Sequence, residues 1–176
     1  MEVKLAFIDH LLGLERRVCR IYEKWAANES FSDDIRSFWR EMADDEKRHL
    51  AILEQSAGLL NFAASAPPTS TGQRERITRE ISTAERASDN PERPIEEVFG
   101  QAIALESSEL NQLDDAWVRG FPPELGNLME AWTPAHDQHI RRLAAAVRRF
   151  TISESLHEAA AALLSQHGRK KRAYSA

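Results

Sequence analysis

Apolar residues recur along this chain with the three- and four-residue spacing of α-helices, and alternating apolar and polar residues are almost absent. The periodic segments are long, and the few glycine and proline residues gather in short breaks between them. The pattern predicts core helices over about residues 2–28, 32–62, 95–119 and 122–150, a short charged helix over 74–88 and a last helix over about 153–168. We therefore expect an all-α protein.

The residues at the breaks support these boundaries. Ser32 and the acidic pair that follows it offer capping oxygens and negative charge at the start of the second helix. Residues 64–73 (ASAPPTSTGQ) and 90–94 (NPERP) read as loops, and Pro122 suits the first turn of a helix that follows Gly120.

The lengths of the connections predict a topology. Tight connections make the first and second core helices antiparallel neighbours, and likewise the third and fourth. Roughly 30 residues separate the second core helix from the third, enough for the chain to return along the bundle and make these two helices parallel. We expect a four-helix bundle over 1–150 with one long crossover, which is the ferritin-like arrangement, then a C-terminal helix over 151–168 and a basic tail over 169–176.

Each core helix carries an apolar stripe that polar side chains interrupt at mid-length. The interrupting residues are Glu15, Glu46, His49, Glu106, Glu109, His136 and His139. A carboxylate or imidazole in a core is costly unless it is paired or bound to a metal. The interruptions lie about 15 residues from the turn of each antiparallel pair, so at about 1.5 Å per residue they meet at one level. This convergence predicts a single polar cluster inside the bundle.

The donor types in this cluster indicate a metal site. Carboxylate oxygens and imidazole nitrogens suit iron, manganese and zinc. Bundles with two metal ions place one Glu on each of two helices and a Glu-x-x-His pair on each of the other two. Glu15 and Glu106 fit the single positions, and Glu46 with His49 forms a complete pair. A buried salt-bridge network and a bundle that has lost its metal remain alternatives, and Leu110 competes with Glu109 for its place on the stripe.

At this point the chain resembles rubrerythrins, a branch of the ferritin-like superfamily. Residues 42–53 (MADDEKRHLAIL) are similar to the second helix of that family, Glu15 with Tyr22 to the first, and Glu106-x-x-Glu109 to the third. The resemblance covers about residues 2–150. It implies two metal ions, most often iron, with Tyr22 as a redox neighbour beside them. It also implies reduction of peroxide or oxygen by an external electron donor, and a homodimer.

Two features depart from the family pattern. His136 and His139 stand where the family has Glu-x-x-His, so an imidazole replaces a carboxylate that would bridge two metals. The only cysteine is Cys19, so the chain has no rubredoxin-type iron centre as an electron donor. Two other functions therefore stay open: a zinc, manganese or iron binding or storage protein without turnover, and a structural bundle with a vestigial site.

Composition narrows the remaining possibilities. The 176 residues carry a net charge of −5 with both signs interspersed, which gives no reason to expect a nucleic-acid partner. No apolar run approaches the roughly 18 residues that cross a bilayer, and no signal peptide is evident, so we expect no membrane partner and a cytoplasmic location. We expect Cys19 to be a small buried hydrophobe and the four tryptophans to pack in the core or an interface. The remaining histidines, His10, His157 and His167, are interpreted as surface residues.

Overall fold

The computed structural model describes residues 2–59, 71–108 and 126–174, and within these ranges the chain is helical, with no strand. The helices are α1 (Glu2–Ala27), α2 (Asp33–Leu59), α3 (Thr71–Ser88), α4 (Ile95–Glu106), α6 (Gly126–Phe150) and α7 (Glu154–Tyr174). The expected all-α class is confirmed.

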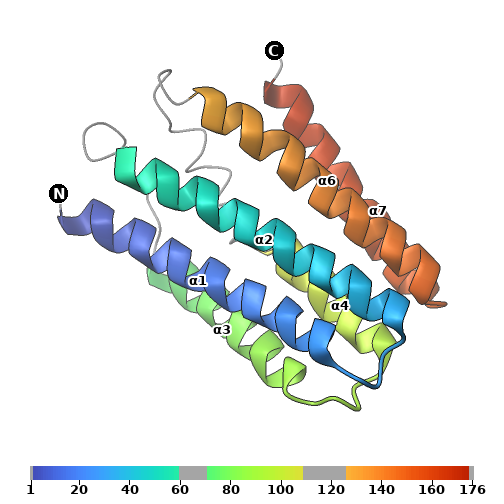
Figure 1. The fold of residues 1–176 in the computed structure, drawn as a ribbon. Coiled ribbons are helices and arrows are strands. Elements are labelled where there is room, and N and C mark those ends of the chain that lie inside the picture. Colours follow the sequence, from blue (N-terminus) through green and yellow to red (C-terminus); the bar gives the residue numbers. More distant parts are fainter. Residues whose placement is uncertain (1, 60–70, 109–125, 175–176) are drawn as a thin grey trace.

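The helices pack side by side as one bundle (Figure 1). α2 contacts both α1 and α6, and α4 contacts α6. The chain runs in opposite directions in α1 and α2, in the same direction in α2 and α4, and in opposite directions in α4 and α6 (Figure 1). α3 lies in the connection from α2 to α4 and packs against α1 and α4, while α7 packs against α6 and α4. Four helices from distant parts of the sequence therefore surround one interior.

Polar caps mark several helix boundaries. The hydroxyl of Ser32 accepts a 3.5 Å hydrogen bond from the backbone N–H of Ile35, and two aspartates begin α2, where negative charge offsets the helix dipole. Thr151 donates a 2.7 Å hydrogen bond to the carbonyl of Val147 at the end of α6. The hydroxyl of Ser153 then accepts one from the N–H of Leu156 at the start of α7.

Two helix ends differ from the sequence prediction. α4 ends at Glu106 rather than continuing through 107 and 108, where the N–H of Ser108 bonds to the carbonyl of Leu105 in a tighter turn. Serine hydroxyls compete with the backbone for hydrogen bonds, which weakens a helix at two successive serines. α7, in contrast, passes Gly168 and continues to Tyr174, because the lysine, arginine and alanine residues of the supposed tail favour helix.

Aromatic side chains fill the end of the bundle near the α1–α2 turn. Trp39 and Phe99 are fully buried with ring centroids 5.0 Å apart, and Tyr22 stacks on Trp39 at 5.6 Å. Trp25 lies 4.7 Å from Trp39 and 5.6 Å from Tyr22, so the three rings contact one another. This layer excludes water from the middle of the bundle, where the polar residues of the four stripes lie. Trp132 is also buried, so the core role is confirmed for these three tryptophans, and Trp117 lies outside the described residues.

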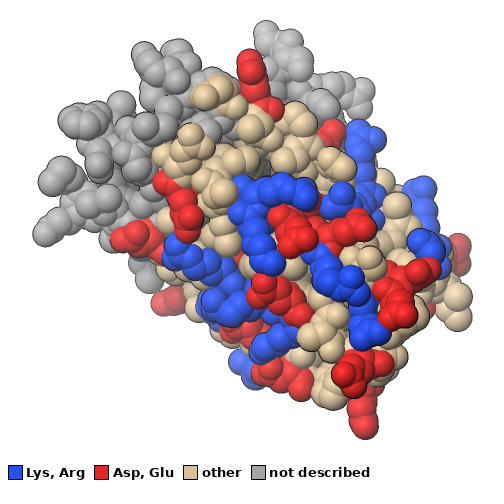
Figure 2. All heavy atoms as spheres, viewed as in Figure 1, with Lys and Arg blue, Asp and Glu red and all other residues tan. Residues whose placement is uncertain are grey.

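One face of the exterior carries charges of both signs. Figure 2 shows lysine and arginine side chains interspersed with aspartate and glutamate over one face of the molecule. Of the helices that the structure describes, none combines the length and apolar character needed to cross a lipid bilayer.

Candidate metal centre

The apolar stripes bring six of the seven predicted ligand residues into the interior of the bundle. Each is at most 6% exposed; they are Glu15, Glu46, His49, Glu106, His136 and His139. The spacing of three residues within α2 and within α6 places both members of each pair on an inward face. The seventh, Glu109, lies outside the described residues.

Three of these side chains, from three different helices, meet around one point. Nε2 of His139 on α6 lies 3.0 Å from Oε1 of Glu106 on α4 and 3.1 Å from Oε1 of Glu46 on α2. One ligand atom from each residue falls within 4.8 Å of the others. In the described ranges this is the one group of three or more such residues that converges so closely, and it could hold a metal ion.

Burial and the neighbouring charges shift the pKa values of this group in opposite directions. Burial raises the pKa of Glu106, but the contacts of His139 and the hydrogen bond from Tyr22 outweigh it and lower that pKa to about 2. Burial lowers the pKa of His139, but the carboxylates of Glu106 and Glu46 raise it well above its usual value. Without a metal, a protonated His139 therefore offsets part of the negative charge of the cluster. A metal ion would displace that proton, because imidazole binds metals in its neutral form.

Asp45 supports His139 from behind, and the sequence analysis missed it. Oδ2 of Asp45 lies 3.4 Å from Nδ1 of His139, and the same carboxylate pairs with Arg48 and Arg142. Burial raises the pKa of Asp45, but His139 and the two arginines bring it below its usual value. A carboxylate behind a ligating histidine fixes the tautomer and leaves Nε2 to bind metal. The spacing could have indicated Asp45, because it lies four residues before His49 and residues four apart share a helix face.

Tyr22 contacts the same oxygen of Glu106 as His139 does. Its hydroxyl donates a 2.5 Å hydrogen bond to Oε1 of Glu106, and its side chain is fully buried. Burial raises the pKa of Tyr22 well above 10, and the charges of Glu106, Glu46 and Glu15 raise it further. Tyr22 is therefore a neutral hydrogen-bond donor that holds one carboxylate in place.

The histidine side of the cluster contains ligand atoms with no partner among the described residues. Nδ1 of His49 lies 3.1 Å from Oε2 of Glu46, while its Nε2 has no such partner, and neither has Nδ1 of His136. Burial lowers the pKa of His136 well below its usual value, and the neighbouring histidines lower it further, so the ring stays neutral. A buried nitrogen without a hydrogen bond costs about 1–3 kcal/mol, a cost that a bound metal would remove. The residues present therefore fit a metal of the iron, manganese or zinc type.

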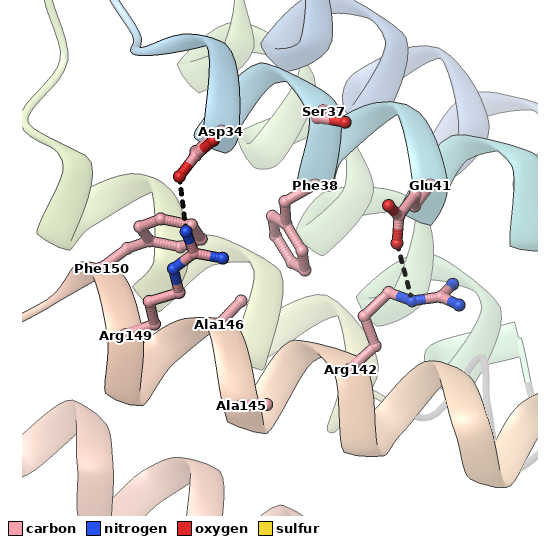
Figure 3. A pocket seen from close by; sticks show the side chains of 9 residues that line it. All are labelled: Asp34, Ser37, Phe38, Glu41, Arg142, Ala145, Ala146, Arg149 and Phe150. Atoms are coloured by element: carbon pink, nitrogen blue, oxygen red, sulfur yellow. Dashed lines mark hydrogen bonds and ion pairs between the residues drawn. The ribbon is translucent and has the colours of Figure 1, made fainter.

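A groove of about 310 Å³ opens between α2 and α6, outside this cluster (Figure 3). Its charged side chains pair with one another: Arg149 with Asp34 at 2.5 Å and Arg142 with Glu41 at 3.2 Å. Arg142 also pairs with Asp45, so the groove is connected to His139 through two ion pairs, although the groove itself presents no cluster of ligands.

The interpretation of the other histidines was wrong for His167. Its side chain is 15% exposed, its ring centroid lies 4.7 Å from that of His136, and its Nε2 lies 3.6 Å from Oδ1 of Asp137. The four core stripes could not reveal it, because His167 belongs to the last predicted helix, which lies outside the core pattern. His10 and His157 are partly buried rather than fully exposed. His157 contacts the carbonyl of Thr151 at 3.0 Å.

The expected environment of Cys19 is confirmed. The side chain is 6% exposed, and its Sγ donates a 3.7 Å hydrogen bond to the carbonyl of Ala43. Burial raises the pKa of the thiol to about 11, with smaller contributions from nearby carboxylates. Cys19 does not belong to the converging group of possible ligands in the described ranges.

No family model, curated protein or solved structure matches this chain. The resemblance to rubrerythrins therefore rests on short motifs and their order along the chain. What can be said of function follows from the buried cluster itself.

Proposed function

We propose that the interior of this bundle binds two iron ions, and that the protein reduces peroxide or oxygen with electrons from an external donor. The observation that carries the proposal is the position of His139 Nε2 between the carboxylates of Glu46 and Glu106, on three helices and away from solvent. A buried arrangement of this kind needs a compensating cation, and the donor types are those that iron accepts.

Each buried residue has a defined part in this proposal. The carboxylates of Glu15, Glu46 and Glu106 compensate the charge of the metal ions, and Glu109 remains a predicted fourth. His49 and His139 provide one nitrogen each. Bound ferrous iron would supply the electrons that reduce the oxidant, and the protein residues orient the ligands and exclude water.

Neighbouring contacts hold these ligands in place. Glu46 accepts a hydrogen bond from Nδ1 of His49 when that nitrogen is protonated, which leaves Nε2 for the metal. Tyr22 restrains Glu106, and Asp45 restrains His139. Tyr22 is also the one phenol beside the cluster among the described residues, which supports the predicted role as a redox neighbour.

A second function is favoured by the histidines of α6. His136 occupies the place of a bridging carboxylate, and imidazole cannot bridge two metals in the same way. The resulting excess of nitrogen donors suits zinc, which has no redox chemistry, and a zinc protein would bind its metal without turnover. A homodimer and an external electron donor remain expectations of the family resemblance.

Metal content followed by rapid mixing tests the proposal. The protein is purified without added metal, and iron, zinc and manganese are measured per chain. Metal-free protein is then loaded anaerobically with ferrous iron and mixed with hydrogen peroxide in a stopped-flow instrument. We expect iron oxidation much faster than that of free ferrous iron. Oxidation no faster than free iron would contradict the redox proposal, and zinc alone at full occupancy would favour the second function.

Two variants compare the effect on iron loading of changing the buried site with that of changing the surface of α2. Glu46→Gln combined with Glu106→Gln removes two ligand charges and is expected to abolish iron loading. Glu54→Gln changes a half-exposed glutamate of α2 that pairs with Arg16, and it is expected to load iron as the unmodified chain does. Equal loading of both variants would show that the buried cluster is not the metal site.

A further inference from the structure

Arg142 connects the groove between α2 and α6 with the buried cluster. Its side chain is 21% exposed and lines the groove, where its Nε lies 3.2 Å from Oε2 of Glu41 (Figure 3). Another nitrogen of the same guanidinium pairs with Oδ2 of Asp45, whose side chain is only 5% exposed. One arginine therefore contacts an exposed carboxylate of the groove and a carboxylate of the interior.

Asp45 extends this connection to His139. The oxygen that pairs with Arg142, Oδ2, also lies 3.4 Å from Nδ1 of His139. The other ring nitrogen of His139, Nε2, lies 3.1 Å from Oε1 of Glu46 and 3.0 Å from Oε1 of Glu106. A single oxygen of Asp45 thus contacts both the arginine of the groove and the histidine of the metal cluster.

The orientation of the Asp45 carboxylate decides what Nδ1 of His139 can contact. This nitrogen is buried and makes no well-aligned hydrogen bond to any residue in the described ranges, so the oxygen of Asp45 at 3.4 Å is the acceptor that it has within reach. A carboxylate behind a ligating histidine fixes the tautomer and the orientation of the ring. The side chain that holds Asp45 in place therefore also affects the position of His139.

The spacing along two packed helices explains how these contacts arise. His139 and Arg142 are three residues apart on α6, and Glu41 and Asp45 are four apart on α2, so each pair shares a helix face. α2 packs against α6, and the two faces meet. A guanidinium is planar and carries five donors, so it can bond two carboxylates at once in a fixed geometry. Arg142 therefore fastens α6 to α2 one turn away from His139.

Two neighbouring arginines differ from Arg142 in what they join. Arg48 also pairs with Asp45, but it lies on the same helix, contacts the other oxygen, Oδ1, and is 62% exposed. Arg149 lines the same groove, yet it pairs with Asp34, and both of these side chains are 65% exposed. Exposed ion pairs contribute little, because solvent screens them. Of these three arginines, Arg142 is the one that ties α6 to the buried carboxylate behind His139.

We propose that Arg142 is a positioning residue of the metal centre: it holds the Asp45 carboxylate in the orientation that fixes the ring of His139 and presents its Nε2 to a cation. Arg142 itself binds no metal and acts only through Asp45. This inference rests on the proposed metal centre, but it requires neither iron nor turnover. It makes the position of a buried ligand depend on a residue of the groove, on the far side of Asp45.

A double-mutant cycle of Arg142→Gln and Asp45→Asn tests the proposal. The zinc affinity of the metal-free chain is measured for each variant and for the combination by competition with a chromophoric chelator. Arg142→Gln alone should weaken zinc binding about tenfold, but it should have little effect once Asp45 is asparagine. Arg149→Gln, on the same helix and in the same groove, should bind zinc as the unmodified chain does. An unchanged affinity in Arg142→Gln, an equal loss with and without Asp45, or an equal loss in Arg149→Gln would overturn the proposal.

Nitrogen NMR of the histidine rings in the metal-free chain gives a second measurement that needs no metal. The signals of His139 are assigned by their loss in His139→Gln. Arg142→Gln should shift the Nδ1 signal of His139 in the same direction as Asp45→Asn does, whereas Arg149→Gln should leave it in place. An unshifted signal in Arg142→Gln would overturn the positioning role. A shifted signal in a chain that binds no zinc would contradict the proposed metal centre, but it would support the orientation of His139 by Arg142.

Discussion

Tyr22 on α1 donates a 2.5 Å hydrogen bond to Oε1 of Glu106 on α4, and the same oxygen lies 3.0 Å from Nε2 of His139 on α6. One carboxylate oxygen thus joins three helices. A phenol and an imidazole with a raised pKa therefore both contact this oxygen. The arrangement shows how the bundle tolerates a buried carboxylate, and it locates the point where a metal ion would replace a proton.

Replacing Tyr22 with phenylalanine tests how much this hydrogen bond contributes. Hydrogen bonds to charged groups contribute about 1.5–3 kcal/mol, and Glu106 keeps its contact with His139. We therefore expect Tyr22→Phe to reduce the unfolding free energy of the metal-free protein by about 1.5 kcal/mol, measured by urea denaturation with a chelator present. An unchanged unfolding free energy would show that the hydrogen bond has no net effect on stability.

Replacing Asp45 with asparagine tests the support behind His139. The variant keeps the size of the side chain but removes the charge that orients Nδ1, so metal affinity should fall by about 10–100-fold. Asp44→Asn is a matched control, because the neighbouring Asp44 is exposed and pairs only with Lys47 among the described residues. Affinities come from competition with a chromophoric chelator. Equal affinities in the two variants would rule out a role for Asp45 in positioning His139.

The helices and the polar cluster followed from periodicity, because apolar spacing is a local property of the chain. The stripes through Glu15, Glu46, Glu106 and His139 correctly indicated which faces are buried. The predicted end of α4 was wrong. The apolar pattern continues past Ser107, but the helix ends at Glu106 because serine side chains compete for local hydrogen bonds.

The supporting residues were harder to predict, because they act across helices. Asp45 shares a stripe with His49, yet only packing of α2 against α6 shows that it contacts His139. His167 is 28 residues from His139, on a helix outside the core pattern, and no periodicity links it to His136. Contacts of this kind depend on how whole helices pack against one another. The local pattern of a single sequence does not show this packing.

Cys19 provides a test of the packing between α1 and α2. The reactive form of cysteine is the thiolate, and burial raises the pKa of this thiol to about 11. Native protein at pH 8 should therefore react with iodoacetamide far more slowly than a free thiol, and urea should restore the normal rate. Mass spectrometry of the alkylated chain measures both rates. Rapid labelling of the native chain would contradict the packed position of Cys19 against Ala43.

Above pH 6.5, a rise in pH should destabilise the metal-free protein but strengthen metal binding. The pKa of Glu106 is lowered from 4.5 to about 2, so its stabilising effect is present above pH 4.5 and is lost as the pH falls toward 2. The pKa of His139 is raised, so its effect is present below pH 6.5 and is lost as the pH rises through the folded value. The pair should stabilise the metal-free protein most between about pH 4.5 and 6.5.

A bound metal competes with the proton on His139, so its affinity should rise as the pH increases from 6 to 8. At a free metal concentration of 100 times Kd, binding adds about 2.7 kcal/mol, or roughly 5–10 °C in Tm for a chain of this size. Thermal unfolding with chelator and with zinc, at pH 6 and at pH 8, measures both trends. His139→Gln should remove the pH dependence of the metal effect, while His10→Ala should keep it. A metal-induced rise in Tm that is equal at the two pH values in the unmodified chain would show that His139 does not exchange its proton for the metal.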